Sequence, residues 1–166
     1  MVTYLKAAKL VDCTGAEAIS NAAVIVEDGR IRQVGPASQL PVPEGAQVLD
    51  LGSGTLMPGL IDSHLHIGED CRREETVGQQ HLQPDALRAI RGVVSLHDDL
   101  MCGVTTARSL GDGTGFVDVI LRDAIDRGEV VGPRLLVAAQ ALRPSHGTAP
   151  EAAVTADGPD EVRRRG

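Results

Sequence analysis

The stretch PGLIDSHLHIG, Pro58 to Gly68, decides the fold prediction for this chain. An apolar run leads into it, and two of the chain's five histidines, His64 and His66, stand one residue apart near its end. In a β-strand, residues i and i+2 point to the same side, so the two imidazoles are expected to project together. The pattern therefore predicts a buried strand that carries two histidines at its carboxyl end.

A polar stretch, residues 68–83, follows this strand, and a helical pattern comes next. The segment from Pro84 to Gly103 begins with a residue suited to the first helical turn and ends with one suited to the position just past a helix. Between them, five residues recur at three- and four-residue spacing and would form a stripe along one side of a helix, which predicts an amphipathic helix. The members of that stripe are Leu87, Ile90, Val94, His97 and Met101.

Two more strands and a second helix follow. VTTARSL predicts a strand, residues 116–127 predict a helix, and the apolar run PRLLVAAQAL, residues 133–142, predicts a strand buried on both faces. This alternation predicts an α/β fold with a parallel sheet. RPSHGTAPEAAVTA predicts a loop, and residues 158–165 predict the opening of a further helix.

The residues before Pro58 have the pattern of short strands. NAAVIVEDGRIRQVG predicts a hairpin of residues 22–27 and 30–34, because Asp28-Gly29 suits the positive φ angles of a type I′ turn. We therefore expect a small β unit over residues 1–57 and an α/β part over residues 58–166.

Composition argues against several classes of function. The net charge is −7, and Tyr4 and Phe116 are the only Phe, Tyr or Trp residues, so nucleic-acid and anionic-membrane partners are not expected. No run reaches the roughly 20 apolar residues of a membrane span. Cys13, Cys71 and Cys102 lack CxxC spacing, which predicts free thiols, and a cytoplasmic protein is expected.

His64 and His66 have the chemistry and the placement of a metal clamp. Sites in parallel α/β folds assemble at the carboxyl ends of strands. Neutral imidazole is a good ligand for zinc and similar divalent ions, and a rigid strand lowers the ordering cost of binding. Asp62 shares that face one layer deeper and is expected to orient a ligand imidazole or a neighbouring loop.

With PGLIDSHLH the chain resembles the amidohydrolase superfamily of metal-dependent hydrolases, in which PGLIDxHxH ends the first strand of a (β/α)8 barrel. NAAVIVEDGRIRQVG is similar to the family's N-terminal β-sandwich hairpin. GVTTARSLGD looks like the second strand of imidazolonepropionase-like and prolidase-like members, and ADGPDEVRR looks like the helix before the fourth strand. The resemblance implies a small β-sandwich unit followed by the first strands and helices of an incomplete TIM-type barrel.

The resemblance also implies a chemistry. His64 and His66 would be ligands of a divalent metal, zinc being the first choice, with one or two ions in a complete site. A metal-bound water or hydroxide would attack a carbonyl carbon and break an amide-type C–N bond. In the family, the bridging lysine and the aspartate that acts as general base lie on later strands, so no catalytic base is expected within this chain.

The implied function is that of the N-terminal part of an amidohydrolase acting on Xaa-Pro or other small peptides. The alternatives within the enzyme class are a cyclic-amide hydrolase of the imidazolonepropionase kind and a deaminase. A non-catalytic truncated fragment, or a subunit that binds a partner, is the alternative from another class. We expect the chain to be inactive alone and to need the missing C-terminal barrel half or a homo-oligomer.

Other residues carry weaker expectations. His146 follows the third strand, where a histidine of prolidase-like relatives can face the substrate. His81 is expected to be solvated, and His97 to lie in a core or interface. The turn GDGTG, residues 111–115, lacks the spacing of a phosphate-binding loop, and Ser109 stands where close relatives tend to carry an acidic residue.

Overall fold

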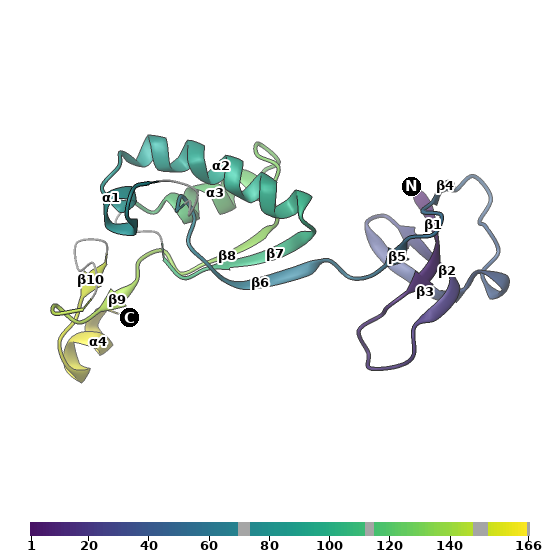
Figure 1. Ribbon diagram of the computed structural model, residues 1–166, viewed down its shortest axis with the longest axis horizontal. Helices are drawn as coiled ribbons and strands as arrows, with labels where there is room; N and C mark the ends of the chain where they lie inside the picture. The colour runs from purple at the N-terminus through teal and green to yellow at the C-terminus, as the bar shows by residue number, and fades with distance from the viewer. Residues whose placement is uncertain (70–73, 112–114, 148–152, 166) are drawn as a thin grey trace. The chain divides into compact units, whose positions relative to one another are not determined.

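A computed structural model describes residues 1–69, 74–111, 115–147 and 153–165 of the chain (Figure 1). The chain divides into two compact units, Met1–Pro58 and Gly59–Gly166. Strands alone build the sheet of the first unit, whereas strands and helices alternate in the second.

The first unit is organised around its first strand. β1 (Val2–Leu10) pairs antiparallel with β2 (Ile19–Glu27), which in turn pairs antiparallel with β3 (Arg30–Pro36). β4 (Gln47–Asp50) and β5 (Thr55–Leu56) both pair parallel with β1. The result is a five-stranded sheet in which β1 is bonded on both of its edges.

The predicted hairpin is confirmed. Asp28 and Gly29, which join β2 to β3, have φ angles of +48° and +74°. Both central residues of a type I′ turn need φ of that sign, and this dipeptide tolerates it. On the sheet, Tyr4 is 3 % exposed and its hydroxyl donates to the carbonyl oxygen of Leu40 at 3.0 Å, beside the short 3-10 helix η1 (Ala37–Gln39).

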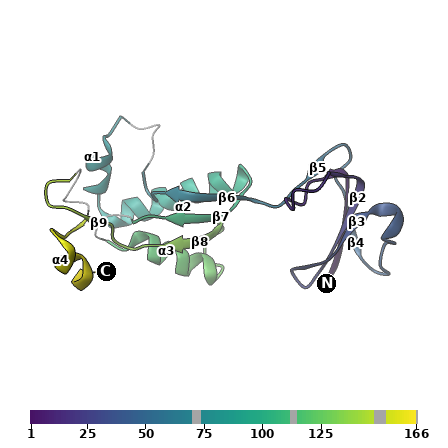
Figure 2. The ribbon, with the colours of Figure 1, turned by 90° about the horizontal axis from the view of Figure 1, so that it is seen from below.

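The second unit contains a parallel sheet with two helices over one face. β6 (Leu60–Leu65), β7 (Val104–Ser109) and β8 (Arg134–Val137) pair in that order. α2 (Asp85–Met101) connects β6 to β7, and α3 (Val117–Asp126) connects β7 to β8; both helices cover the same face (Figures 1 and 2). The predicted α/β pattern with parallel strands is confirmed.

The main core of this unit lies between the sheet and its helices. Gly92 allows α2 to approach closely, since a Cβ there would lie 2.6 Å from side-chain atoms of both Ile67 and Leu121. On β7, Ala107 is fully buried and Arg108 is exposed, as expected for a strand with one covered face. The buried members of the cluster are Ile67, Leu96, Ala107, Val117, Leu121 and Leu135.

The stripe predicted along α2 does not face this core. Ile90, Val94 and Met101 are 65 %, 54 % and 72 % exposed, and His97 is exposed as well, so His97 does not lie in the core of this unit, and its alternative position in an interface stays a prediction. The residues that α2 buries are Arg88, Gly92 and Leu96. Apolar periodicity missed this face because its contact surface includes a glycine and an arginine paired with a carboxylate rather than apolar side chains alone.

The third strand of the sheet is shorter than its apolar run predicted. β8 has four residues, after which the chain turns at Ala139, whose φ is +63°. β9 (Leu142–Arg143), which begins at the last residue of that run, pairs in parallel with β10 (Val154–Thr155), which lies inside the segment predicted as loop. α4 (Pro159–Arg165) confirms the predicted helix opening.

The sheet face opposite the helices is open in the part of the chain that the structure describes. Leu136 alternates with the buried Leu135 and is 56 % exposed, and Ile61 on β6 is 74 % exposed. In that same part, β6 and β8 are the edge strands of the sheet. Unpaired strand edges favour pairing with further strands. Exposed apolar side chains favour packing of further chain on this face of the sheet.

Candidate metal-binding edge

The carboxyl end of β6 brings two imidazoles together. His64 lies within the strand and His66 directly follows it. Their ring centroids are 5.4 Å apart, with the ring planes inclined by 69°. His64 is exposed and His66 is partly buried, so the pair sits where the interior of the unit meets its surface.

A backbone contact fixes the tautomer of His66. Its Nδ1 lies 3.0 Å from the carbonyl oxygen of Gly111, which follows β7. A carbonyl oxygen can only accept a hydrogen bond, so Nδ1 carries the proton and donates. The lone pair of the neutral ring is then on Nε2, the arrangement usual for histidines that bind metals.

Asp62 acts on the backbone at this edge. Its Oδ1 accepts a hydrogen bond of 2.9 Å from the backbone N–H of His64. The predicted role of Asp62 was to orient an imidazole or a neighbouring loop, whereas this contact holds the main chain of a predicted ligand. A carboxylate that accepts from an edge N–H also satisfies a group that an unpaired strand would leave to water.

The loop after β6 ends in a short helix that buries His81. Helix α1 (Val77–His81) begins with a capping box in which Thr76 accepts from the backbone of Gln79 and the Gln79 side chain accepts from the backbone of Thr76. The His81 side chain is 4 % exposed, and its Nε2 lies 2.8 Å from Oε1 of Glu69, in an ion-pair contact whose alignment falls short of hydrogen-bond geometry. The expectation of a solvated His81 is therefore wrong.

The groups around Glu69 favour its ionised form. Burial raises the pKa of its carboxyl, but contact with His81 and the fields of His66, His81 and Arg143 outweigh burial and leave the pKa below its ordinary value. The Glu69 carboxylate thus contacts His81 of α1 and also interacts electrostatically with His66, a predicted metal ligand. The sequence offered no signal for this link, because the partners are 12 residues apart in a polar stretch.

His146 lies apart from these contacts, in the exposed turn after β9. The neighbouring backbone N–H of Ser145 donates to Oδ1 of Asp157 at 2.9 Å. Hydrogen bonds from Ser145, with a smaller contribution from His146, lower the pKa of the Asp157 carboxyl. The predicted substrate contact of His146 stays a prediction.

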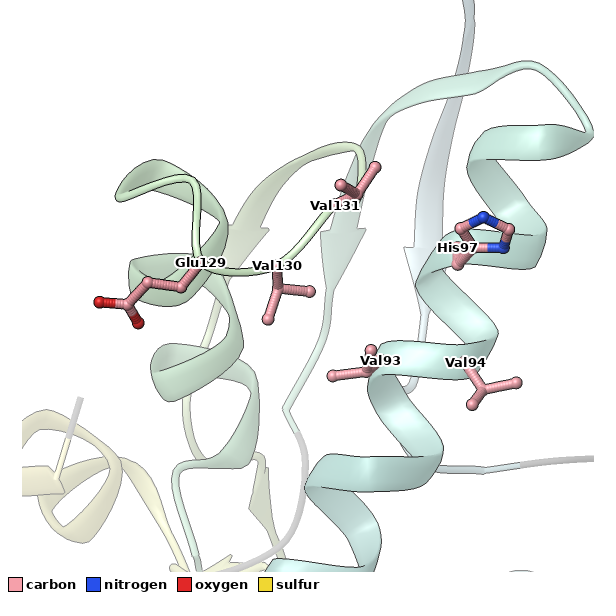
Figure 3. Close-up of a pocket in the computed structure, with 6 residues that line it drawn as sticks. All are labelled: Val93, Val94, His97, Glu129, Val130 and Val131. Carbon is pink, nitrogen blue, oxygen red and sulfur yellow. The ribbon is translucent and has the colours of Figure 1, made fainter.

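A shallow groove lies at the opposite end of the sheet (Figure 3). It has a volume of about 350 Å³ and runs between α2 and the segment that leads into β8. The residues that line it are Val93, Val94, His97, Glu129, Val130 and Val131. Because this segment precedes β8, the groove is at the amino ends of the strands, whereas sites of parallel α/β folds form at the carboxyl ends.

The histidine pair fits part of a metal site. Zinc usually takes four ligands, and imidazole nitrogen is one of its preferred donors. Among the described residues, no group of three or more His, Cys, Asp or Glu side chains is arranged to hold a metal ion. The donors on β6 therefore suit two positions of a larger ligand set.

The sequence also singles out the cysteines, the turn at residues 111–115 and Ser109. Cys13 and Cys102 are free and exposed, and Cys71 lies outside the described residues. The middle of the turn at residues 111–115 also lies outside them. Ser109 is fully buried, and its Oγ lacks a hydrogen-bond partner within the described part of the chain.

Arg108 is the residue at this edge that sequence reasoning missed. Its Nε donates to the carbonyl oxygen of Ser63, one residue before His64, at 2.8 Å. The signal was a lone arginine inside a strand of otherwise small and β-branched residues. Arg108 is exposed, and its guanidinium reaches the backbone of the neighbouring strand.

Known proteins share both the sequence and the fold of this chain. A sequence model of the Amidohydrolase family matches residues 55–165, more than half of the chain. An imidazolonepropionase of Rhizobium rhizogenes is 35 % identical over 85 residues, which are 49 % of this chain and 21 % of that protein. A dihydroorotase of Mycobacterium tuberculosis is 43 % identical over 49 residues, 30 % of this chain and 11 % of the relative.

Solved structures match almost the whole chain. A prolidase in complex with N-methylphosphonate-L-proline has a TM-score of 0.78 and 27 % identity, and the match covers 99 % of this chain and 43 % of the prolidase. An ochratoxinase of A. niger has a TM-score of 0.77 and 26 % identity, with 98 % of this chain and 42 % of that one covered. The chain thus spans less than half of these relatives. The predicted resemblance is confirmed, and the chain belongs to the amidohydrolase family.

Proposed function

We propose that this chain is the N-terminal part of a metal-dependent amidohydrolase that breaks amide-type C–N bonds in Xaa-Pro or other small peptides. The observation that carries the proposal is the pair of imidazoles at the end of β6, 5.4 Å apart, with Nδ1 of His66 engaged by Gly111. The match to a prolidase solved with a phosphonate derivative of proline supports the substrate class.

The chain's own residues prepare a site for a divalent metal, of which zinc is the first choice. His64 and His66 would hold it. When bound, such an ion polarises the carbonyl of a scissile amide. Glu69 contacts His81 in the segment that follows the pair, and the Gly111 carbonyl keeps the His66 ring in one tautomer. These contacts reduce the freedom that the ligands lose on binding.

We also propose that the open face of the second unit packs against the rest of a longer amidohydrolase barrel. The exposed Leu136 and Ile61 support this proposal, as do the edges of β6 and β8, which are unpaired among the residues that the structure describes. Three strands are too few to close a barrel. A homo-oligomer that covers the same face is the alternative partner.

A cyclic-amide hydrolase is the second candidate. The 35 % identity to an imidazolonepropionase favours it, over a region that includes about half of the chain. Within the described residues, no helix has the length and apolar character needed to cross a membrane. The cytoplasmic location and the absence of a nucleic-acid partner stay predictions.

Zinc titration of the purified chain tests the metal site. Calorimetry is expected to show binding that disappears in a His64→Ala/His66→Ala variant and persists in a His97→Ala variant, since His97 lies on the exposed flank of α2. Light scattering in the same samples reports self-association. Equal zinc binding in the wild type and the double variant would refute the assignment of the pair.

Substrate choice is tested with the complete gene product rather than with this chain alone. Release of proline from Xaa-Pro dipeptides, with no turnover of imidazolonepropionate, is the expected result. The reverse preference would replace the proposal with the cyclic-amide candidate. Stoichiometric metal with no turnover of either substrate would contradict both and favour a deaminase or a non-catalytic role.

A further inference from the structure

The ladder between β6 and β7 is irregular just before the histidine pair. Asp62 pairs with Ala107 and Leu65 pairs with Ser109, so the strand segment between them has one more residue on β6 than on β7. Ser63 and His64 together face the single residue Arg108. This is a β-bulge, a feature found preferentially beside active sites, where it changes the direction of a side chain.

Two charged side chains hold the peptide group at the bulge. The carbonyl oxygen of Ser63 accepts from Nε of Arg108 at 2.8 Å, and the N–H of His64 donates to Oδ1 of Asp62 at 2.9 Å. Both groups belong to one peptide bond, the one that joins Ser63 to His64. A guanidinium thus holds its oxygen end and a carboxylate holds its hydrogen end.

This arrangement opposes rotation of the peptide plane. A peptide unit has a dipole of about 3.5 D, and here its negative end meets a cation and its positive end meets an anion. Hydrogen bonds with one ionised partner are shorter and roughly twice as strong as neutral ones. The N and Cα atoms of His64 both belong to this peptide plane, so its orientation, together with φ of His64, sets the direction of the His64 side chain.

We propose that Arg108 is a positioning residue that locks this bulge and thereby sets the geometry of the His64–His66 pair for a metal. The inference rests on the proposed function of the pair as metal ligands. Arg108 acts through the Ser63 carbonyl, with Asp62 as its counterpart on the other end of the same peptide group.

The first test is zinc affinity. Arg108→Gln is expected to weaken zinc binding by roughly 10- to 100-fold, the range typical for loss of a group that supports a metal ligand. Arg108→Lys retains a cation that can donate one hydrogen bond, so it is expected to recover part of the loss. Arg134→Gln is the matched control, because Arg134 is also an exposed arginine on the same sheet. Affinities of all three variants within twofold of the wild type would overturn the proposal.

The second test needs no metal and separates the two proposals. In NMR spectra of the metal-free chain, Arg108→Gln is expected to shift the imidazole signals of His64 and His66 and to leave those of His97 and His146 in place. If the wild type binds no zinc but these shifts occur, the metal function fails while the positioning role stands. Unchanged His64 and His66 signals, or equal shifts at every histidine, would overturn the positioning role. If Arg108→Gln does not fold, the same spectra of Arg108→Lys decide the matter.

Discussion

Replacing Gly59 by alanine is expected to destabilise the second unit by about 1–3 kcal/mol, the usual cost of forcing a methyl group into a packed contact. A Cβ at this position would lie 2.6 Å from Cβ of Thr105 and closer still to its Oγ1 and Cγ2. Non-bonded carbons prefer about 3.5–4.0 Å. The cause is steric, because φ of Gly59 lies outside the positive range that disfavours alanine.

Thr105 cannot relieve this overlap by rotation alone. Its side chain is branched at Cβ, so every χ1 rotamer leaves the Cβ in place and most positions around it filled. The backbone of β6 or β7 must therefore move. Gly59 directly precedes β6, so the shift would reach the strand that carries the histidine pair.

Urea unfolding followed by circular dichroism measures the effect. With a slope near 2 kcal/mol per molar urea, the midpoint should fall by roughly 0.5–1.5 M. Thr105→Gly removes all three atoms that a new Cβ would meet, so the Gly59→Ala cost should fall to a few tenths of a kcal/mol in that background. Gly35→Ala, whose Cβ would lie 3.7 Å from the nearest atom, controls for the substitution itself. Equal costs of Gly59→Ala with and without Thr105 would refute the steric explanation.

Two further predictions concern buried carboxylates. Asp118 is fully buried, and its carboxylate accepts hydrogen bonds from the backbone N–H groups of Val119 at 2.8 Å and Ala139 at 3.1 Å. Asp118→Asn leaves one acceptor oxygen, so it should lower the free energy of unfolding by about 1–3 kcal/mol and speed amide exchange at Ala139. Unchanged exchange at Ala139 would contradict the role of this hydrogen bond. The lowered pKa of Glu69 means that the contacts of its carboxylate, of which the one with His81 is the largest, add stability above pH 4.5, the ordinary value for this group. This stability is lost as the pH falls through the lower folded value. Acid titration of the stability should flatten in Glu69→Gln, and an identical acid profile in that variant would contradict the assignment.

The parts of the fold that the sequence predicted depend on local rules. The hairpin followed from Asp28-Gly29, because the turn type is set by two adjacent residues with positive φ. The helices followed from their end signals, and the order of strands and helices followed from chain connectivity. At the candidate site, the i, i+2 spacing of His64 and His66 was enough to expect neighbouring rings.

The features that escaped prediction depend on register and on contacts between distant segments. Arg108 meets Ser63 only because β6 contains one extra residue, and a bulge of that kind leaves no mark in a single sequence. The His81 side chain is buried and contacts Glu69, although polar residues surround it in the sequence. The left-handed turn at Ala139, which ends β8, likewise depends on a buried carboxylate 21 residues away.

The outward stripe of α2 has a different cause. Ile90, Val94 and Met101 do fall on one side of the helix, as the periodicity predicted. That side is exposed among the described residues, whereas the other side packs on the core through Gly92 and Leu96. A helix with apolar residues on two sides is usual where it has two neighbours rather than one. The exposed Leu136 on the other face of the sheet follows the same logic, because a strand with apolar residues on both faces belongs between two layers. The hydrophobic pattern of this unit therefore exceeds what the described sheet of β6, β7 and β8 and the helices α2 and α3 cover, and the proposed addition of further barrel strands and helices would supply both missing contacts at once.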